Sequence, residues 1–285
     1  MVGDAPEANP TGDPAGRPAA DHRSGPELTG LRVLVTGGSS GIGAALARLL
    51  AAGGATVGIV GRRADRLAEV LEDCRRTSPG SRSWTLDLAD LEGAERLAVE
   101  AWDTLGHLDV LVNNAAVPKV RPLTRLQAAE VEATMGVNFF SPVRMTLAVL
   151  DRMVARARGT IVNVASVGGR LGVYHEAAYS ASKFALCGWS ESLAMELDGT
   201  GVAVRLVHPG PIATDIWDRP GEERAVYDGP LEPPGVVAEG IVAAVFSDRF
   251  EHYVPDLSGV VAYKNSDIDG YLKAASQYSR EAHTR

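Results

Sequence analysis

The feature that most constrains the fold is an alternation of short apolar runs with amphipathic segments, which begins at Leu31. Runs such as "VLVTG" and "DVLVNNA" lack polar alternation, which is typical of parallel strands buried on both faces. Segments between them, such as "ADRLAEVLEDC", carry apolar residues at helical spacing. This order predicts βαβ units and one doubly wound α/β domain. Strands are expected near 31–37, 55–61, 83–88, 108–116, 159–166, 202–210 and 250–256.

The ends of the chain have a different composition from this domain. Residues 1–27 are rich in Pro, Gly, Ala and Asp, so we expect a disordered tail, with the α/β domain at 28–257. The Pro- and Gly-rich segment 211–235 is predicted to be a lid over a binding crevice. Within it, Trp217 either contacts substrate or packs into the core. The extension 258–285 either lies at a subunit interface, covers the pocket or hangs free.

Charge and cysteine content exclude several classes of function. A formal net charge of −8 and a pI near 5.3 argue against nucleic acid and against an anionic membrane surface as partners. No apolar run reaches the roughly 18 to 20 residues that span a bilayer. The two cysteines, Cys74 and Cys187, lie far apart and near no histidine cluster. We therefore expect neither a disulfide framework nor a metal site, and a cytoplasmic protein.

The first strand runs into a glycine-rich turn, "TGGSSGIGAAL", with glycines at Gly37, Gly41 and Gly43. A tight turn between a strand and a helix lets backbone N–H groups approach a pyrophosphate at the helix N-terminus. The spacing differs from the common G-x-G-x-x-G pattern. The turn predicts a nucleotide site, and the alternative is a turn with no ligand.

The second strand ends in "GRRADRL", with Arg62 and Arg63 where an NAD site would place an acidic residue. Two guanidinium groups suit a phosphate through bidentate hydrogen bonds, which favours NADP over NAD. The alternative is a solvated helix start capped by Asp65.

Polar residues also follow the next two strands. Asp87 ends the third strand, and Asn113, Asn114, Ala115 and Ala116 follow the fourth. In open α/β sheets, ligands bind outside the carboxyl ends of the strands, so these residues are expected to face one crevice. Asn and Asp are also common turn formers, which is the structural alternative.

Tyr179 and Lys183 lie four residues apart in a helical run, and so on one helix face. A neighbouring ammonium favours phenolate and is expected to lower the tyrosine pKa by about 1 to 3 units. Ser166, 13 residues earlier, ends the fifth strand and would open onto the same crevice. The alternative is a surface tyrosine stacked along a lysine stem.

The motifs "TGGSSGIG", "NNAA", "NVAS", "YSASK" and "HPGPIAT" occur in the order and spacing of classical short-chain dehydrogenases/reductases, which this chain resembles from about Leu31 to Thr214. The resemblance implies a Rossmann-type sheet of about seven parallel strands with helices on both faces. It also implies hydride transfer between a nicotinamide and a ketone or secondary alcohol.

The resemblance also implies roles for single residues. Tyr179 would donate a proton to the carbonyl oxygen, Lys183 would hold the nicotinamide ribose, and Ser166 would bind the substrate oxygen. Asn138 would support a water in the proton relay. Asp87 would meet adenine, Asn113 the adenosine ribose region, and Ile212 and Thr214 the carboxamide. The predicted cofactor set is Gly37, Ser39, Ser40, Gly41, Ile42, Gly43, Arg62, Arg63, Asp87, Leu88, Asn114, Ala115, Tyr179, Lys183, Pro209, Gly210, Ile212 and Thr214.

Two positions depart from the family pattern. His175, in the loop before Tyr179, is a candidate substrate contact, and its alternative is a solvated loop residue. Ala116 stands where glycine is more frequent in the family, a change that should not abolish cofactor binding.

The leading hypothesis is an NADP-dependent oxidoreductase acting on a small carbonyl or alcohol substrate, more as a reductase. The competing hypotheses are an epimerase or dehydratase relative and a non-catalytic nucleotide-binding regulator. The resemblance further implies a homodimer or homotetramer, with contacts through residues 138–153 and 179–197. The substrate itself is left open.

Overall fold

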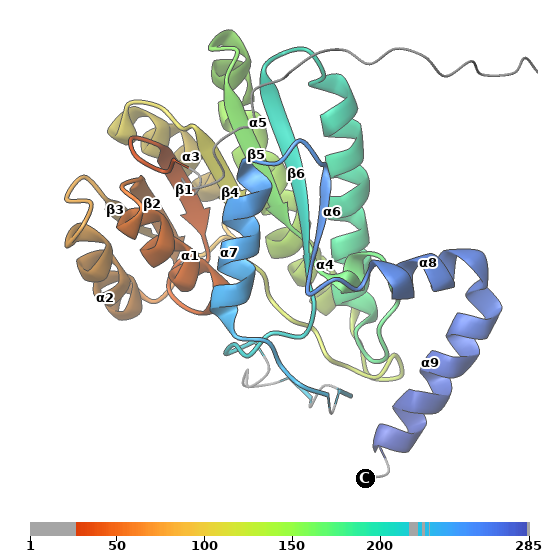
Figure 1. Ribbon diagram of the computed structural model, residues 1–285. Helices are drawn as coiled ribbons and strands as arrows, with labels where there is room; N and C mark the ends of the chain where they lie inside the picture. The colour runs from red at the N-terminus through yellow and green to blue at the C-terminus, as the bar shows by residue number, and fades with distance from the viewer. Residues whose placement is uncertain (1–26, 217–221, 224–225, 228, 284–285) are drawn as a thin grey trace, which may run out of the picture.

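A computed structural model describes residues 27–216, 222–223, 226–227 and 229–283 and contains a single parallel sheet (Figure 1). Its seven strands lie in the order β3-β2-β1-β4-β5-β6-β7, and every neighbouring pair is parallel. This confirms the doubly wound, seven-stranded fold expected from the sequence. The strands are β1 Arg32–Thr36, β2 Thr56–Gly61, β3 Arg82–Thr85, β4 Val110–Asn113, β5 Gly159–Val164, β6 Val202–Pro209 and β7 Glu251–Val254.

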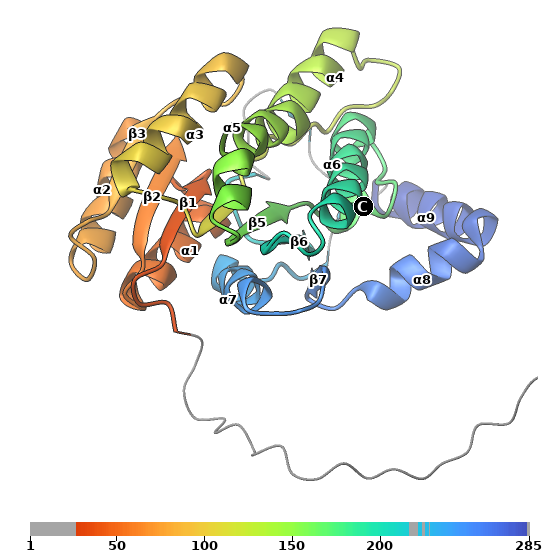
Figure 2. The same ribbon diagram turned by 90° about the horizontal axis from the view of Figure 1, so that it is seen from above.

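Helices cover both faces of the sheet, as Figure 2 shows from above. One layer holds α1 (Gly41–Ala52), α2 (Ala64–Arg75) and α7 (Pro234–Val245). The other holds α3 (Leu91–Leu105), α5 (Ser141–Ala155) and α6 (Ala177–Glu196). The short α4 (Ala128–Met135) packs against α6. A parallel sheet needs such cover because both of its faces are apolar.

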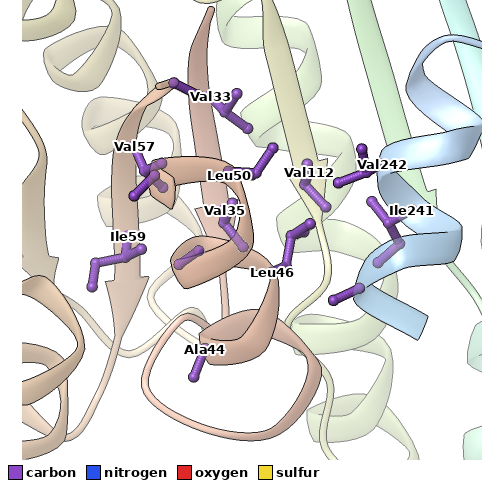
Figure 3. Packing of buried hydrophobic residues seen from close by; sticks show 14 of the residues in the cluster. Val33, Val35, Ala44, Leu46, Leu50, Val57, Ile59, Val112, Ile241 and Val242 are labelled. Atoms are coloured by element: carbon purple, nitrogen blue, oxygen red, sulfur yellow. The ribbon is translucent and has the colours of Figure 1, made fainter. Parts of the chain in front are cut away.

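The strand side chains alternate between two apolar clusters. Val33, Val35 and Val57 point toward α1 and α7, where they meet Leu46 and Ile241 (Figure 3). Leu34 and Leu111, one residue out of phase, point to the layer of α3 and α5. Both clusters are close to fully buried, and burial of each such side chain contributes about 1.5 to 3 kcal/mol. Because helices pack against both faces of the sheet, the carboxyl ends of the strands are held in fixed positions relative to one another.

Two departures from regular helix frame the site. Helices α4 and α5 form one run that is interrupted by a π-helical segment, Gly136–Phe140. A 3₁₀ turn, Val167–Gly169, follows β5. Such π segments occur frequently at functional sites.

The C-terminal residues form two further helices, α8 (Ser258–Ser266) and α9 (Ile268–His283), which extend away from the sheet (Figure 1). The Tyr271 hydroxyl in α9 donates a hydrogen bond to the Gly172 carbonyl at 3.2 Å, so α9 is tied to the loop before α6. Over the residues that the structure describes, no helix has the length and apolarity needed to cross a membrane.

Candidate active site

A cavity of about 1250 Å³ opens at the carboxyl ends of the strands. This is the edge at which open α/β sheets bind ligands. Most of the predicted site residues line it: Gly37, Ser39, Ser40, Gly41, Ile42, Arg62, Arg63, Asp87, Leu88, Asn114, Ala115, Ser166, Tyr179, Lys183, Pro209, Gly210, Ile212 and Thr214.

The glycine turn between β1 and α1 forms one end of the cavity. Gly37 and Gly41 have φ of +72° and +53°, the left-handed region that favours glycine. Gly43 does not line the cavity: a Cβ there would lie 2.3 Å from the Gly37 carbonyl oxygen. Gly43 therefore allows α1 to approach the turn, while Gly37 and Gly41 shape the surface that faces a ligand.

Arg63 and Arg66 converge on one anion beside this turn. Arg63 Nη1 and Arg66 Nη1 each lie 3.0 Å from Oδ2 of Asp215, and Arg63 Nη2 donates to Ser40 Oγ at 2.6 Å. Arg62 turns aside, with Nη1 3.6 Å from Asp87 Oδ2. Sequence reasoning missed Arg66, although its position three residues after Arg63 on a helix was the available signal.

The amide residues after β4 separate into two environments. Asn113 is 2 % exposed and donates to Asn163 Oδ1 at 2.9 Å, inside the core. The prediction that Asn113 meets the adenosine ribose is therefore wrong, because neighbouring residues of a strand point to opposite sides. Asn114 lines the cavity, and its Nδ2 donates to the Thr36 carbonyl at 2.8 Å.

Ser166, Tyr179 and Lys183 meet at the centre of the cavity. Ser166 follows β5, and its carbonyl accepts a 2.9 Å hydrogen bond from Nδ1 of the buried His208. Lys183 is 1 % exposed, donates to the Val164 carbonyl at 2.9 Å, and lies 5.8 Å from the Tyr179 ring centroid. The sequence analysis missed the hydrogen bond by which His208 holds the backbone of Ser166, although the motif "HPG" contains His208.

The structure corrects the expected direction of the Tyr179 pKa. Burial raises the pKa of this phenol above its ordinary value; the Ser166 hydrogen bond opposes this and the Glu176 carboxylate adds to it. Burial also lowers the pKa of Lys183 to about 8, against a smaller opposite effect of Cys187. The spacing argument counted the cation and omitted desolvation, which is the larger effect for both groups.

Asn138 is fully buried in the π-helical segment and does not line the cavity. Its Oδ1 accepts from the Val117 N–H at 2.8 Å, and its Nδ2 donates to the Val117 carbonyl at 2.9 Å. Nδ2 also donates to Ser182 Oγ at 3.0 Å. Asn138 thereby joins the loop after β4 to α6, one residue before Lys183.

The substrate contacts expected from the sequence fare differently. His175 does not line the cavity: its φ is +63° and its ring stacks on that of Tyr174, with centroids 4.1 Å apart, so its contact with substrate stays a prediction. Trp217 lies outside the described residues. The lining residues that sequence reasoning missed include Tyr174, Glu176, Glu222, Tyr271 and Tyr278.

A network of ion pairs joins the segment after β6 to the loop after β4. Glu222 Oε1 lies 2.6 Å from Lys119 Nζ, and Glu222 Oε2 accepts from the Val120 N–H at 2.9 Å. Arg125 Nη2 lies 2.8 Å from Glu223 Oε2. These contacts hold one margin of the cavity. Within the described ranges, no group of three or more His, Cys, Asp or Glu residues is arranged to hold a metal ion.

The fold and this cavity define an α/β dinucleotide-binding protein with a tyrosine, a lysine and a serine at the ends of its strands. Comparison of the sequence with protein families gives a match to the short chain dehydrogenase family over residues 32–225. The chain belongs to this family. It is accordingly an NAD(P)-dependent oxidoreductase that acts on CH–OH groups.

Similar proteins carry several different activities in their names. Ketoacyl reductase HetN of Nostoc sp. is 32% identical over 218 residues, covering 76% of each chain. D-threitol dehydrogenase of Mycolicibacterium smegmatis is 33% identical over 197 residues, covering 68% of this chain and 76% of that one.

Solved structures agree with the fold. A short-chain dehydrogenase from Streptomyces avermitilis aligns with a TM-score of 0.75 and 28% identity over 88% of this chain and 97% of that one. A short chain dehydrogenase/reductase from Burkholderia phymatum in complex with NAD aligns with a TM-score of 0.77 and 25% identity, covering 85% and 95%.

Proposed function

We propose that this protein is an NADP-dependent reductase of ketones, with Tyr179 as the proton donor. The observation that carries the proposal is the meeting of Tyr179, Ser166 and Lys183 in the same cavity as the glycine turn and the arginines. A bound nicotinamide would supply hydride to the carbonyl carbon. The residues below would bind the cofactor, orient the substrate and provide the proton.

The proposed preference for NADP is supported by two arginines that already bind a carboxylate of the chain, that of Asp215. The Asp215 carboxylate sits between Arg63 and Arg66, with Ser40 adjacent. A 2′-phosphate carries oxygens of the same kind and more charge, so it would suit these guanidinium groups better than a ribose hydroxyl does. In this proposal Arg63 and Arg66 bind the phosphate, and Arg62 with Asp87 flanks the adenine.

Proton transfer is supported by the state of the phenol. The Tyr179 hydroxyl is protonated at neutral pH, as a donor to a developing alkoxide must be, and burial, which raises its pKa, makes it a weaker acid than a free phenol. Ser166 hydrogen-bonds the substrate oxygen and keeps it within reach of Tyr179. Lys183, with a pKa of about 8, is largely protonated at neutral pH and orients the nicotinamide ribose.

Asn138 acts in this proposal as a positioning residue for the proton relay. Its side chain clamps the Val117 backbone and Ser182, between the loop after β4 and the start of α6. Replacement by alanine should therefore lower kcat and leave the Kd for NADPH nearly unchanged.

The test is NADPH consumption with a panel of ketones, followed at the nicotinamide absorbance band, for the wild-type protein and Tyr179→Phe. The proposal expects turnover with NADPH that the variant loses. NADPH binding without turnover of any ketone would favour the non-catalytic regulator. Turnover that survives in Tyr179→Phe would overturn the role of the phenol.

We further propose a homodimer or homotetramer formed through α5 and α6. Large apolar side chains on these helices are exposed: Leu147 (53%) and Val154 (37%) on α5, Phe184 (40%) and Met195 (73%) on α6. Large exposed apolar side chains are the kind that a subunit interface covers. Light scattering of the wild type and of Leu147→Lys with Met195→Lys tests this, with a monomeric wild type as the contradicting result.

A further inference from the structure

A carboxyl group lies one helical turn before Tyr179 on the cavity wall. Glu176 directly precedes α6, and its carbonyl accepts a 2.8 Å hydrogen bond from the Ser180 N–H, as in a regular first turn. Residues three apart on a helix are neighbours on one face. Glu176 and Tyr179 both line the cavity, so a ligand that reaches the phenol also passes the carboxyl.

Four of the five other carboxyl groups that line the cavity have cationic partners, among them Asp87 with Arg62, and the fifth, Glu232, forms no ion pair among the described residues. Asp215 pairs with Arg63 and Arg66, Glu222 with Lys119, and Glu223 with Arg125. Among the described residues, none donates a hydrogen bond to the Glu176 carboxyl or forms an ion pair with it. The charge of the Glu176 carboxylate acts on Tyr179, whose pKa it raises.

The surroundings of Glu176 make this lack of a partner costly. Leu171, Val173, Tyr174 and Tyr271 line the same part of the cavity. Burial raises the pKa of the Glu176 carboxyl to about 7. A half-buried carboxyl in an apolar wall is unfavourable unless something donates to it. A substrate can supply that donor.

Charge is distributed unevenly along the cavity. Its described arginines, Arg62, Arg63 and Arg66, all belong to the end formed by β2 and α2. The end next to Glu176 carries aromatic and carboxyl groups. An anionic substrate would meet a carboxylate beside the reacting carbon, whereas a donor group would meet an acceptor.

We propose that Glu176 determines specificity by accepting a hydrogen bond from a donor group next to the reacting carbonyl. This inference rests on the proposed ketone reductase function. The substrate class is then ketones that carry a hydroxyl or a protonated amine on the adjacent carbon, with an apolar or aromatic body lying against Tyr174 and Tyr271. The corresponding alcohols are diols and amino alcohols.

The test uses four aryl ketones of similar size with NADPH: α-hydroxyacetophenone, α-aminoacetophenone, propiophenone and phenylglyoxylate. The first two carry a donor, the third carries none, and the fourth carries a carboxylate. At about pH 8, where a Glu176 carboxyl with a pKa of about 7 is mostly ionised, we expect kcat/KM for the two donor ketones to exceed that for propiophenone by about tenfold or more, the value of a hydrogen bond to a charged group. Phenylglyoxylate is expected to be the poorest substrate.

Glu176→Leu should remove the advantage of both donor ketones over propiophenone. Because the Glu176 carboxylate also raises the pKa of Tyr179, the quantity compared is the ratio of kcat/KM between donor ketone and propiophenone in the same variant. Glu176→Gln, which keeps an acceptor oxygen without the charge, should lose most for the amine and less for the hydroxyl. Glu239→Gln, an exposed acid on α7, is the control for net charge. The Kd for NADPH, from nicotinamide fluorescence, and the melting temperature should not fall in any variant.

The possible failures are distinguishable. Equal kcat/KM for all four ketones, or an equal loss for propiophenone and the donor ketones in Glu176→Leu, overturns the role of Glu176 and leaves the reductase function standing. NADPH binding with no turnover of any ketone overturns the reductase function, and this inference with it.

Discussion

The two ends of the cavity are built in different ways. The cofactor end consists of the turn after β1 and the ends of β2, β3 and β4, whose residues are adjacent to buried strands. The substrate end consists of the loop before α6, the segment after β6 and one face of α9. Strand ends are fixed by a sheet packed on both faces, whereas loops and a peripheral helix depend on individual hydrogen bonds and ion pairs. The proposed cofactor end is therefore fixed by the packing of the sheet, and the proposed substrate end by local contacts.

The largest expected effect is on kcat, and it comes from Tyr179, which lies between the cofactor end and the substrate end of the cavity. Tyr179→Phe should lower kcat by roughly 10²- to 10⁴-fold, the usual contribution of a positioned acid or base. The Kd for NADPH should change by less than about threefold, because the phenol serves the chemistry and the cofactor end stays intact. Stopped-flow reduction and fluorescence titration measure the two quantities. Tyr174→Phe, on the substrate wall, is the matched control and should retain kcat.

A second change tests the cofactor end alone. Arg63→Ala with Arg66→Ala should raise the KM for NADPH by about tenfold for each guanidinium lost, and the KM for NADH far less. Arg62→Ala should have the smaller effect, because that side chain turns toward Asp87. Steady-state kinetics with both cofactors provide the measurement. A parallel rise for NADPH and NADH would contradict the phosphate assignment.

A substitution at the cofactor end should also strengthen NADPH binding. Asp215→Asn removes the carboxylate that competes for Arg63 and Arg66. We expect NADPH to bind a few-fold more tightly and NADH to bind unchanged. Weaker NADPH binding in this variant, measured by calorimetry, would mean that Asp215 holds the arginines in place for the phosphate.

The buried lysine makes stability depend on pH. Burial lowers the pKa of Lys183 from 10.5 to about 8, so between these values the folded protein binds fewer protons at this site than the unfolded chain. The contribution of Lys183 to the free energy of unfolding therefore rises with pH, by about 1 kcal/mol per pH unit inside this window. Urea denaturation at about pH 8 and pH 9 should show this rise for wild type relative to Lys183→Met.

Lys273→Met, an exposed position on α9, serves as the control and should follow the wild-type pH dependence. The buried thiols and Tyr179, whose pKa values are raised, act in the opposite direction at higher pH. Those contributions are present in all three proteins and largely cancel in the differences. A wild-type curve parallel to that of Lys183→Met would show that Lys183 keeps its proton throughout.

The smallest effect compares the stability of the two ends. Tyr271→Phe removes the hydrogen bond from α9 to Gly172 and should cost about 1 kcal/mol or less. Leu111→Ala, fully buried in β4, should cost about 2 to 5 kcal/mol. Urea denaturation gives both values. A larger cost for Tyr271→Phe than for Leu111→Ala would show that α9 is part of the cooperative core.

The sequence predicts the cofactor end of the cavity better than the substrate end. The strands and the turn at Gly37 and Gly41 could be predicted because buried parallel strands are continuously apolar and a left-handed turn selects glycine. The residues around Tyr179 could be placed because their motifs are local. The fold and the cofactor end therefore needed little information from distant parts of the chain.

The remainder could not be predicted because it depends on distant contacts and on burial. Lys119 and Glu222 are far apart in the chain yet form one ion pair, and no local pattern encodes it. The lining face of α9 needs the Tyr271 contact to Gly172. The pKa of Tyr179 was predicted with the wrong sign because helix spacing gives the distance between charges and says nothing about the loss of water.

The π-helical segment at Gly136–Phe140 has a consequence for how the chain tolerates deletions. It accommodates one residue more than regular α-helix would, and each residue of an α-helix turns the chain by about 100°. Removal of one residue from this stretch would therefore restore a regular spiral and leave the residues that follow at the same rotation. Met145, Val149 and Met153 would stay sealed against the sheet. The irregularity is thus a place where the chain absorbs an extra residue without disturbing the core, whereas a deletion inside the regular turns of α5 would rotate the remaining part of its buried face by about 100°.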